Sequence, residues 1–252
     1  MNTREVDVSF DTTHGVVTKR ALNEKGALRL AWESAALFVL QPSPHTPDML
    51  GYRSRSFGEL SMRYVDGKPF TAVMGMDKNW RCRPMSWATF RPYFEQYVAV
   101  EADLLARGAL YRDLNPDHLI YARNGHAVLV DHEATLFKTE DMRAWSMHNR
   151  RGTWETMAPE EFRPWSEVTG RIATYRAGVL AHVALAGELP FPRLPLREAV
   201  YQWRRTHDPL VDATLPHDVQ VSLSGALARQ PGRRQPDPMT LLHELDSVVG
   251  TE

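Results

Sequence analysis

The chain has 252 residues, of which 43% are hydrophobic and 24% charged, as in an ordinary globular protein, and its net charge of −1 gives no basic field that would favour nucleic acid or an anionic membrane. No apolar run approaches the roughly 20 residues that span a bilayer, and the opening residues MNTREVDVSF lack the apolar core of a secretory signal. Cys82 is the single cysteine, so an internal disulfide is excluded and we expect a cytoplasmic setting, although a secreted effector with a non-standard export route would have the same composition.

The first part of the chain predicts strands around one helix. Val6–Phe10 alternates apolar and polar residues, the turn DTTHG follows, and a β-branched run returns, which predicts a hairpin over residues 6–20. A helix is predicted from about Ala27 to Leu40, because small and apolar side chains recur on one face. The Pro-rich stretch PSPHTPDM is a connector, and residues 57–66 predict a further strand before a turn at Asp66–Gly67.

The remainder of the chain is predicted to be mostly helical. A long amphipathic helix runs from Ser86, a suitable N-cap, to Arg107, and Gly108 ends it. Two short strands joined by an Asn-Gly turn follow, at Leu119–Tyr121 and Ala127–Val130. Later helices are predicted over Ile172–Ala186, Leu196–Arg205, Val219–Arg229 and Thr240–Val248. Because strands come first and helices after, the sequence predicts an α+β fold with two segregated parts.

Two aspartates flank the predicted hairpin in LYRDLNPDHLIYARNGHAVLVDHEA. Asp113 follows the long helix and Asp131 ends the hairpin. A tight hairpin brings its flanks together, so we expect both carboxylates in one cleft, where they suit a divalent cation and a general base. A turn or cap role is the commoner one for an isolated aspartate. A metal-hydrolase site built from His126, Asp131, His132 and Glu133 is disfavoured, because adjacent residues at a strand end point to opposite sides.

The order of the motifs resembles the protein-kinase superfamily. YRDLNPDH is similar to the catalytic loop, VDHE takes the position of Asp-Phe-Gly, and GTWETMAPEEF resembles the end of the activation segment. VVTK is similar to the strand that carries the nucleotide-binding lysine, and ARQPGRRQP to the late Pro-x-x-Arg element. The resemblance implies a bilobal kinase-like α+β fold. Residues 1–66 would be a reduced β-rich N-lobe that lacks the first strand and the Gly-rich loop, and residues 67–252 a mostly helical C-lobe.

The resemblance implies a role for each residue that matches a motif. Lys19, paired with Glu33, would hold the α and β phosphates of ATP, and Asp113 would be the catalytic base that orients the acceptor hydroxyl. Asp131 would bind the metal ion, Mg²⁺ or Mn²⁺, that bridges the phosphates. His118 stands where the family has the asparagine that binds a second metal ion.

Two further sets of residues follow from the same resemblance. Met62 takes the gatekeeper position of LSMRYVDG, and Tyr64 and Val65 would contact the nucleotide in the hinge. Glu160 and Arg234 would form an ion pair that braces the C-lobe, which is a structural role.

Several positions depart from the family pattern. His132 and Glu133 replace Phe-Gly, which removes the packing aromatic, and Ala173 replaces the aspartate of the anchoring helix, so the catalytic loop needs another support. DLNP and Glu133 are similar to the aminoglycoside-kinase group. An imidazole at His118 is a poor ligand for Mg²⁺ and a better one for Mn²⁺, and it must be deprotonated to bind either ion. We therefore expect activity that prefers manganese and falls in acid, unless His118 packs under the loop instead.

Three functions stay open on the sequence alone. The first is an atypical minimal protein kinase that transfers the ATP γ-phosphate to a Ser or Thr hydroxyl, favoured by the retained lysine and acids. The second is a pseudokinase that acts as a binding or scaffolding module, favoured by the missing Gly-rich loop and by His118 and Ala173. The third is a small-molecule, aminoglycoside-like phosphotransferase, favoured by DLNP and Glu133 and opposed by the Ala-Pro-Glu segment and the Pro-x-x-Arg element. We expect a protein substrate or partner, and neither nucleic acid nor a membrane.

Overall fold

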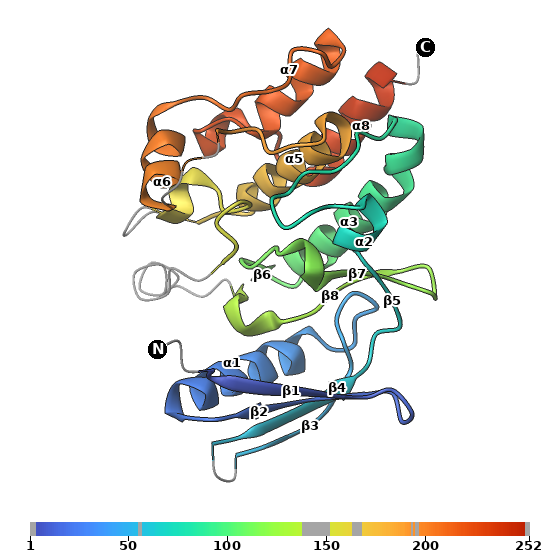
Figure 1. Ribbon diagram of the computed structural model, residues 1–252, viewed down its shortest axis with the longest axis vertical. Helices are drawn as coiled ribbons and strands as arrows, with labels where there is room; N and C mark the ends of the chain where they lie inside the picture. Colours follow the sequence, from blue (N-terminus) through green and yellow to red (C-terminus); the bar gives the residue numbers. More distant parts are fainter. Residues whose placement is uncertain are drawn as a thin grey trace.

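The structure is a computed structural model that describes residues 4–54, 57–137, 152–162, 168–192, 194 and 197–249 (Figure 1). It has two parts, a small β-rich lobe formed by the first strands and α1, and a larger helical lobe that lies above it in Figure 1. The predicted bilobal α+β fold with a reduced N-lobe is confirmed. Among the described residues, no helix combines the length and the apolar character needed to cross a bilayer.

The N-lobe is an antiparallel sheet with the strand order β1-β2-β4-β3. These strands are β1 (Val6–Asp11), β2 (Val16–Ala21), β3 (Met49–Arg53) and β4 (Glu59–Arg63). The predicted hairpin is β1 and β2, in which Val8 pairs with Lys19. The strand β3 was not predicted, because its sequence MLGYR follows a Pro-rich stretch and alternates weakly.

Helix α1 (Glu24–Leu40) packs against this sheet. It begins earlier than predicted, because the side chain of Asn23 accepts a hydrogen bond from the Gly26 N–H and caps the helix. A small apolar cluster joins the helix to the sheet, formed by Ala21, Leu30, Leu37, Leu60 and Met62. The alternation of β2 and β4 and the helical periodicity of α1 place these residues on facing surfaces.

A three-stranded sheet connects the two lobes, with the order β5-β7-β8. Its strands are β5 (Gly67–Pro69), β7 (Leu119–Ala122) and β8 (Ala127–Leu129). The prediction of a turn at Asp66–Gly67 is wrong, because Gly67 begins β5 and pairs with Ala122. A Cβ atom at Gly67 would lie 2.4 Å from the backbone oxygen of Tyr121, so the close approach of the two strands requires glycine.

The C-lobe is built around α5 (Arg171–Ala186), whose residues from Ile172 to Ala184 are all buried. The other long helices are α3 (Trp87–Ala106), α6 (Arg197–Thr206), α7 (His217–Ala226) and α8 (Pro238–Val249). Shorter elements are α2 (Phe70–Met74), β6 (Ala109–Leu110), β9 (Leu136–Phe137) and the 3₁₀ segments η1 (Pro116–His118), η2 (His132–Ala134), η3 (Pro159–Phe162) and η4 (Pro231–Arg233). Ser86 caps α3 as predicted, because its hydroxyl accepts the Thr89 N–H. The segment between α3 and β7 lies on the side of the C-lobe that faces the N-lobe (Figure 1).

Candidate active site

An ion cluster lies between the lobes. The Lys19 Nζ on β2 donates to Glu33 Oε1 of α1 at 2.7 Å and to Asp131 Oδ1 at 2.9 Å. Asp131 follows β8, so three separate elements supply the cluster. The structure thus brings together the lysine, its expected glutamate partner and the acid expected to bind metal.

Burial and charge give the two acids different properties. Burial raises the pKa of Glu33 to about 7, since its side chain is 1% exposed and the attraction of Lys19 offsets only part of the cost. Burial also opposes ionisation of Asp131, but the charge and hydrogen bond of Lys19, together with the smaller effects of His118 and Arg29, outweigh it and lower the pKa of that carboxyl. The two carboxylates together raise the pKa of Lys19 in spite of its burial. Asp131, with 24% of its side chain exposed, is therefore the acid that stays charged and faces solvent, as a cation ligand must.

The backbone at Asp131 is left-handed, with φ 66° and ψ 71°. A non-glycine residue in this conformation costs about 1–3 kcal/mol, and such strain is common at functional sites. The next residue, His132, maintains the conformation. Its N–H donates to Glu33 Oε1 at 3.3 Å, and its ring nitrogens lie 2.8 Å from the Leu129 oxygen and 3.1 Å from the Thr135 hydroxyl.

His132 also packs where the family resemblance places a phenylalanine. Its ring meets Tyr111 edge to face at 5.4 Å between centroids, and it is fully buried. The expectation that this replacement removes the packing aromatic is therefore wrong, because the imidazole takes the same place as a flat ring. Burial lowers the pKa of His132 to about 4, so it is neutral at physiological pH.

Helix α1 is fastened to η2 by contacts that the sequence reading missed. Arg29 binds the Glu133 carboxylate through two nitrogens and Glu5 through the third, at 2.8 Å for Glu5. The indole of Trp32 donates to the Thr135 carbonyl at 2.9 Å. Arg29 lies one turn before Glu33 on the same helix, but this spacing does not indicate the contact to Glu133. These bonds fix α1, and therefore Glu33, relative to Asp131.

Asp113 lies in the loop between β6 and η1. Its carboxylate accepts the Thr153 hydroxyl at 2.7 Å, and its carbonyl accepts the Asn115 N–H at 2.7 Å. The Asn115 side chain then caps η1 by accepting the Asp117 N–H at 3.0 Å. The Asn-Pro pair thus forms a capped turn that keeps the half-buried carboxylate of Asp113 at the edge of a pocket.

His118 lies beside Asp131 and Tyr111. Its Nε2 is 3.7 Å from Asp131 Oδ2, and its Nδ1 is 3.5 Å from the Tyr111 hydroxyl, which donates to the Val130 carbonyl at 2.8 Å. In the described part of the chain, no three His, Cys, Asp or Glu side chains form a metal-binding group. Asp131 and His118 could therefore hold a cation only together with ligands from a substrate, such as phosphate oxygens.

Beside the ion cluster lies a pocket of about 290 Å³. Lys19, His118, Asp131 and the exposed Asp117 form its polar side. The predicted gatekeeper Met62 and hinge residues Tyr64 and Val65 all line it, and the sequence reading missed the apolar side chains of Val8, Phe10, Val17, Ile120 and Val130. A pocket with one apolar and one polar side suits a flat base joined to phosphates.

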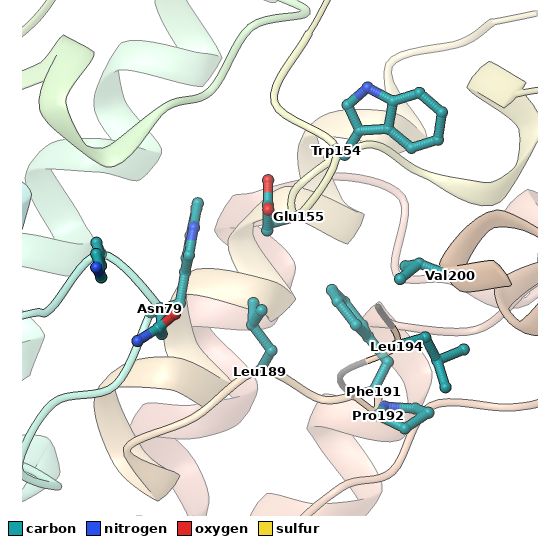
Figure 2. A pocket seen from close by; sticks show the side chains of 10 residues that line it. Asn79, Trp154, Glu155, Leu189, Phe191, Pro192, Leu194 and Val200 are labelled. Atoms are coloured by element: carbon teal, nitrogen blue, oxygen red, sulfur yellow. The ribbon is translucent and has the colours of Figure 1, made fainter. Parts of the chain in front are cut away.

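A second hollow of about 470 Å³ begins at Asp113 and shares Asp117 with the first. Asp113 and Asp131 thus line adjoining pockets. The second hollow continues into a third of about 260 Å³ through Lys78, Trp80, Trp154 and Glu155, which line both. Figure 2 shows the third pocket, with Trp154 and Glu155 on one side and Leu189 and Phe191 on the other.

The expected structural pair lies in the C-lobe. The Arg234 guanidinium contacts both oxygens of Glu160, each at 2.7 Å, and both residues are buried. The pair links η3 to the residue that follows η4. Ala173 is buried in α5 at the position where the family resemblance places an aspartate.

The chain is similar in sequence to protein kinases. It is 33% identical over 102 residues to a probable cAMP-dependent protein kinase catalytic subunit of Encephalitozoon cuniculi. The matched stretch covers 40% of this chain and 30% of that protein. It is 31% identical over 101 residues to CBL-interacting protein kinase 5 of Oryza sativa, at 40% and 22% coverage. It is 29% identical over 132 residues to serine/threonine-protein kinase PknH of Mycobacterium tuberculosis, at 52% and 20% coverage. No protein-family model matches the chain, and the matched stretch covers less than a third of each relative.

Proposed function

We propose that this chain, a relative of the protein kinases with their bilobal fold, transfers the γ-phosphate of ATP to a serine or threonine hydroxyl of a protein. The observation that carries the proposal is the ion cluster of Lys19, Glu33 and Asp131 at the polar end of a largely apolar pocket, with Asp113 in the adjoining hollow. This arrangement supports a nucleotide site on one side of Asp117 and an acceptor site on the other.

The chemistry assigned to each residue follows from its surroundings. Lys19 would release Asp131 to contact the nucleotide phosphates while Glu33 keeps its ammonium in place. Asp131, with His118 beside it, would hold Mg²⁺ or Mn²⁺, which neutralises charge that develops on the phosphates. Asp113 would accept the proton of the acceptor hydroxyl as that oxygen bonds to the γ-phosphorus and the bond to the β-phosphate oxygen breaks. Thr153 occupies Oδ1 of Asp113 and so orients the carboxylate.

The hollow beyond Asp113 supports a polypeptide acceptor. Among the described residues, Asp77, Asp113, Asp117 and Glu155 line it together with one cation, Lys78, and the charge of these residues favours a basic acceptor. Its apolar extension past Trp154 to Phe191 suits a side chain some distance from the reacting hydroxyl. Of the two observations offered for a small-molecule kinase, DLNP and Glu133, the second does not distinguish the two kinds of acceptor, because Arg29 binds the Glu133 carboxylate.

The pseudokinase remains a second candidate, on one observation. Lys19 already neutralises Asp131 at 2.9 Å, so the cluster is satisfied without ligand. Such a self-contained cluster would hold the lobes together in a scaffold that needs no nucleotide.

Nucleotide binding separates these two functions. If Lys19 and Asp131 hold ATP and metal, nucleotide at about a hundred times its dissociation constant adds about 2.7 kcal/mol to the free energy of unfolding. For a chain of this size this raises the melting temperature by about 5 to 10 °C. We expect this shift with ATP and either Mg²⁺ or Mn²⁺, and its loss in Asp131→Asn. An unchanged melting temperature with both ions at millimolar ATP would establish the scaffold instead.

The metal preference tests His118. An imidazole nitrogen favours Mn²⁺ over Mg²⁺, while an amide oxygen suits Mg²⁺. We expect His118→Asn to lower the ratio of the manganese rate to the magnesium rate by about tenfold, a difference of about 1.4 kcal/mol. The rates of phosphate transfer at saturating ATP give the ratio. If the ratio stays the same, His118 acts through its contact with Tyr111 and is no ligand.

The charge of the acceptor hollow is tested at Glu155. Reversing its charge places a cation beside Lys78, which should repel a basic acceptor. We expect Glu155→Lys to lower kcat/KM for a basic Ser peptide by about tenfold, or about 1.4 kcal/mol, and to leave the ATP-induced melting shift unchanged. Transfer to an aminoglycoside, with no transfer to peptides, would assign the hollow to small molecules.

A further inference from the structure

Helix α5 carries an arginine at its buried centre that neither the family resemblance nor the proposed function uses. Arg176 lies one turn after Ala173, and its side chain has no exposed surface. One terminal nitrogen of its guanidinium donates to the backbone carbonyl of Tyr111, and the other donates to Glu161 Oε1 at 2.7 Å. Tyr111 is two residues before Asp113, so Arg176 contacts the loop of the expected base directly from the core of the C-lobe.

Glu161 connects this contact to Arg112, just before Asp113, and to Ala158 in a second segment. Its Oε1 also accepts Arg112 Nε at 3.2 Å, from the residue immediately before Asp113. Its Oε2 accepts the Ala158 N–H at 2.8 Å. Ala158 ends the short segment that begins with Thr153, the residue whose hydroxyl binds the Asp113 carboxylate. The buried carboxylate of Glu161 therefore links the residues before Asp113 to the segment from Thr153 to Ala158.

The guanidinium of Arg176 keeps its charge. Burial lowers the pKa of Arg176, but the charges of Glu161 and Glu101 raise it by more, so the net direction is upward and the guanidinium stays protonated. Buried ion pairs are seldom more stabilising than apolar residues of the same volume, although removing one partner is severe. Stability alone therefore does not explain why a cluster of charges surrounds this one loop.

We propose that Arg176 is a positioning residue for Asp113, the support that replaces the missing carboxylate at position 173. A guanidinium has only donors, so it must hold the loop by a carbonyl, whereas a carboxylate has only acceptors and would hold an N–H. Arg176 takes the Tyr111 carbonyl, and Glu161 couples that bond to Arg112 and Ala158. The inference rests on the proposed function in one respect, the role of Asp113 as the base.

The chain offers a matched control for this proposal. Glu160 and Arg234 form a second buried ion pair, with contacts at 2.7 Å, beside Glu161 in sequence, and Arg234 also donates to the carbonyls of Arg171 and Ala228. The double variants Glu161→Gln/Arg176→Gln and Glu160→Gln/Arg234→Gln each replace a buried pair by two neutral amides that can still hydrogen-bond. Both should lower the melting temperature, so loss of stability does not distinguish them.

Two measurements on the full chain do distinguish them. We expect amide hydrogen exchange in residues 111–115 to become at least about tenfold faster in Glu161→Gln/Arg176→Gln and to stay within about twofold in the control. We expect kcat to fall at least about tenfold in the first variant with KM for ATP within about twofold, because a displaced base slows the chemical step without disturbing Lys19 and Asp131. Equal exchange rates in the two variants, or equal kcat values, would overturn the positioning role.

A single variant covers the case in which the double variant does not fold. Arg176→Lys keeps a charge next to Glu161 and Glu101 but has one ammonium group in place of a fork, so it cannot hold the Tyr111 carbonyl and Glu161 in the same geometry. We expect near-wild-type melting with faster exchange in residues 111–115, and wild-type exchange would overturn the proposal. If the wild-type protein transfers no phosphate at all, the proposed function fails, while the exchange measurements still decide whether Arg176 holds the loop.

Discussion

Asp113→Asn is expected to lower the rate of phosphate transfer by about 10²–10⁴-fold, the usual contribution of a positioned general base. The amide keeps the size of the side chain and can still accept the Thr153 hydroxyl, which binds Asp113 Oδ1 at 2.7 Å. The amide cannot, however, take up the proton that the acceptor hydroxyl loses. Because Asp113 does not line the pocket that contains Lys19 and Asp131, ATP should still raise the melting temperature as in the wild type.

The measurement combines radiolabel transfer at saturating ATP with thermal melting. Asp66→Asn is the matched control, since this aspartate is exposed and forms a surface ion pair with Arg123 outside both pockets. Its transfer rate should stay within about twofold, because surface ion pairs contribute about 0–1 kcal/mol. A wild-type rate in Asp113→Asn would remove Asp113 from the chemistry and, with it, the assignment of the acceptor hollow.

The stability of the wild-type protein is expected to fall more steeply in acid than that of His132→Phe. The pKa of His132 is lowered from 6.5 to about 4, mainly by burial, so the unfolded chain binds a proton in a range where the folded protein does not. The free energy of unfolding that depends on the neutral ring is fully present above pH 6.5 and is lost as the pH falls toward 4. The difference of about 2.5 pH units corresponds to about 3 kcal/mol.

Urea unfolding at pH 7.5 and pH 4.5, with a chelator present, measures this difference. Phenylalanine can keep the edge-to-face packing against Tyr111 but does not titrate, so the loss between the two pH values should be about 3 kcal/mol smaller in the variant. The variant also loses the contacts to Leu129 and Thr135, which lowers its stability at both pH values and leaves the comparison of slopes intact. An equal slope in His132→Phe would mean that other groups carry the acid sensitivity.

The parts of the fold that the sequence predicted are those with local signals. The hairpin of β1 and β2, the Ser86 cap of α3 and the helical periodicity of α5 all lie within a few residues of their cause. Strands β3 and β5 were missed, because their pairing depends on partners elsewhere in the chain and on the close approach that Gly67 permits.

The same distinction applies to the candidate site. The ion cluster and the pocket beside it contain the residues that the motifs indicated, since the resemblance supplied long-range information that composition lacks. Arg29 and Arg176 could not be singled out in this way. An arginine on a helix is usually a surface residue, so the sequence predicts no buried partner for it. Glu133, the partner of Arg29, lies 104 positions away in the chain. Only the folded arrangement shows that both arginines are structural partners of the site.

The small apolar cluster beneath α1 has a consequence for how the protein opens. Regions with few buried apolar contacts unfold locally before the rest. The N-lobe has the five-residue cluster of Ala21, Leu30, Leu37, Leu60 and Met62, far smaller than the core around α5, and polar bonds from Lys19, Arg29 and Trp32 attach it to the C-lobe side. Lys19 and Asp131, which the proposed function assigns to the phosphates and the metal ion, thus also supply one of the bonds that keep the N-lobe closed. A ligand that replaced this bond would have to supply equivalent contacts across the lobes, so opening of the N-lobe and occupancy of its pocket would be linked.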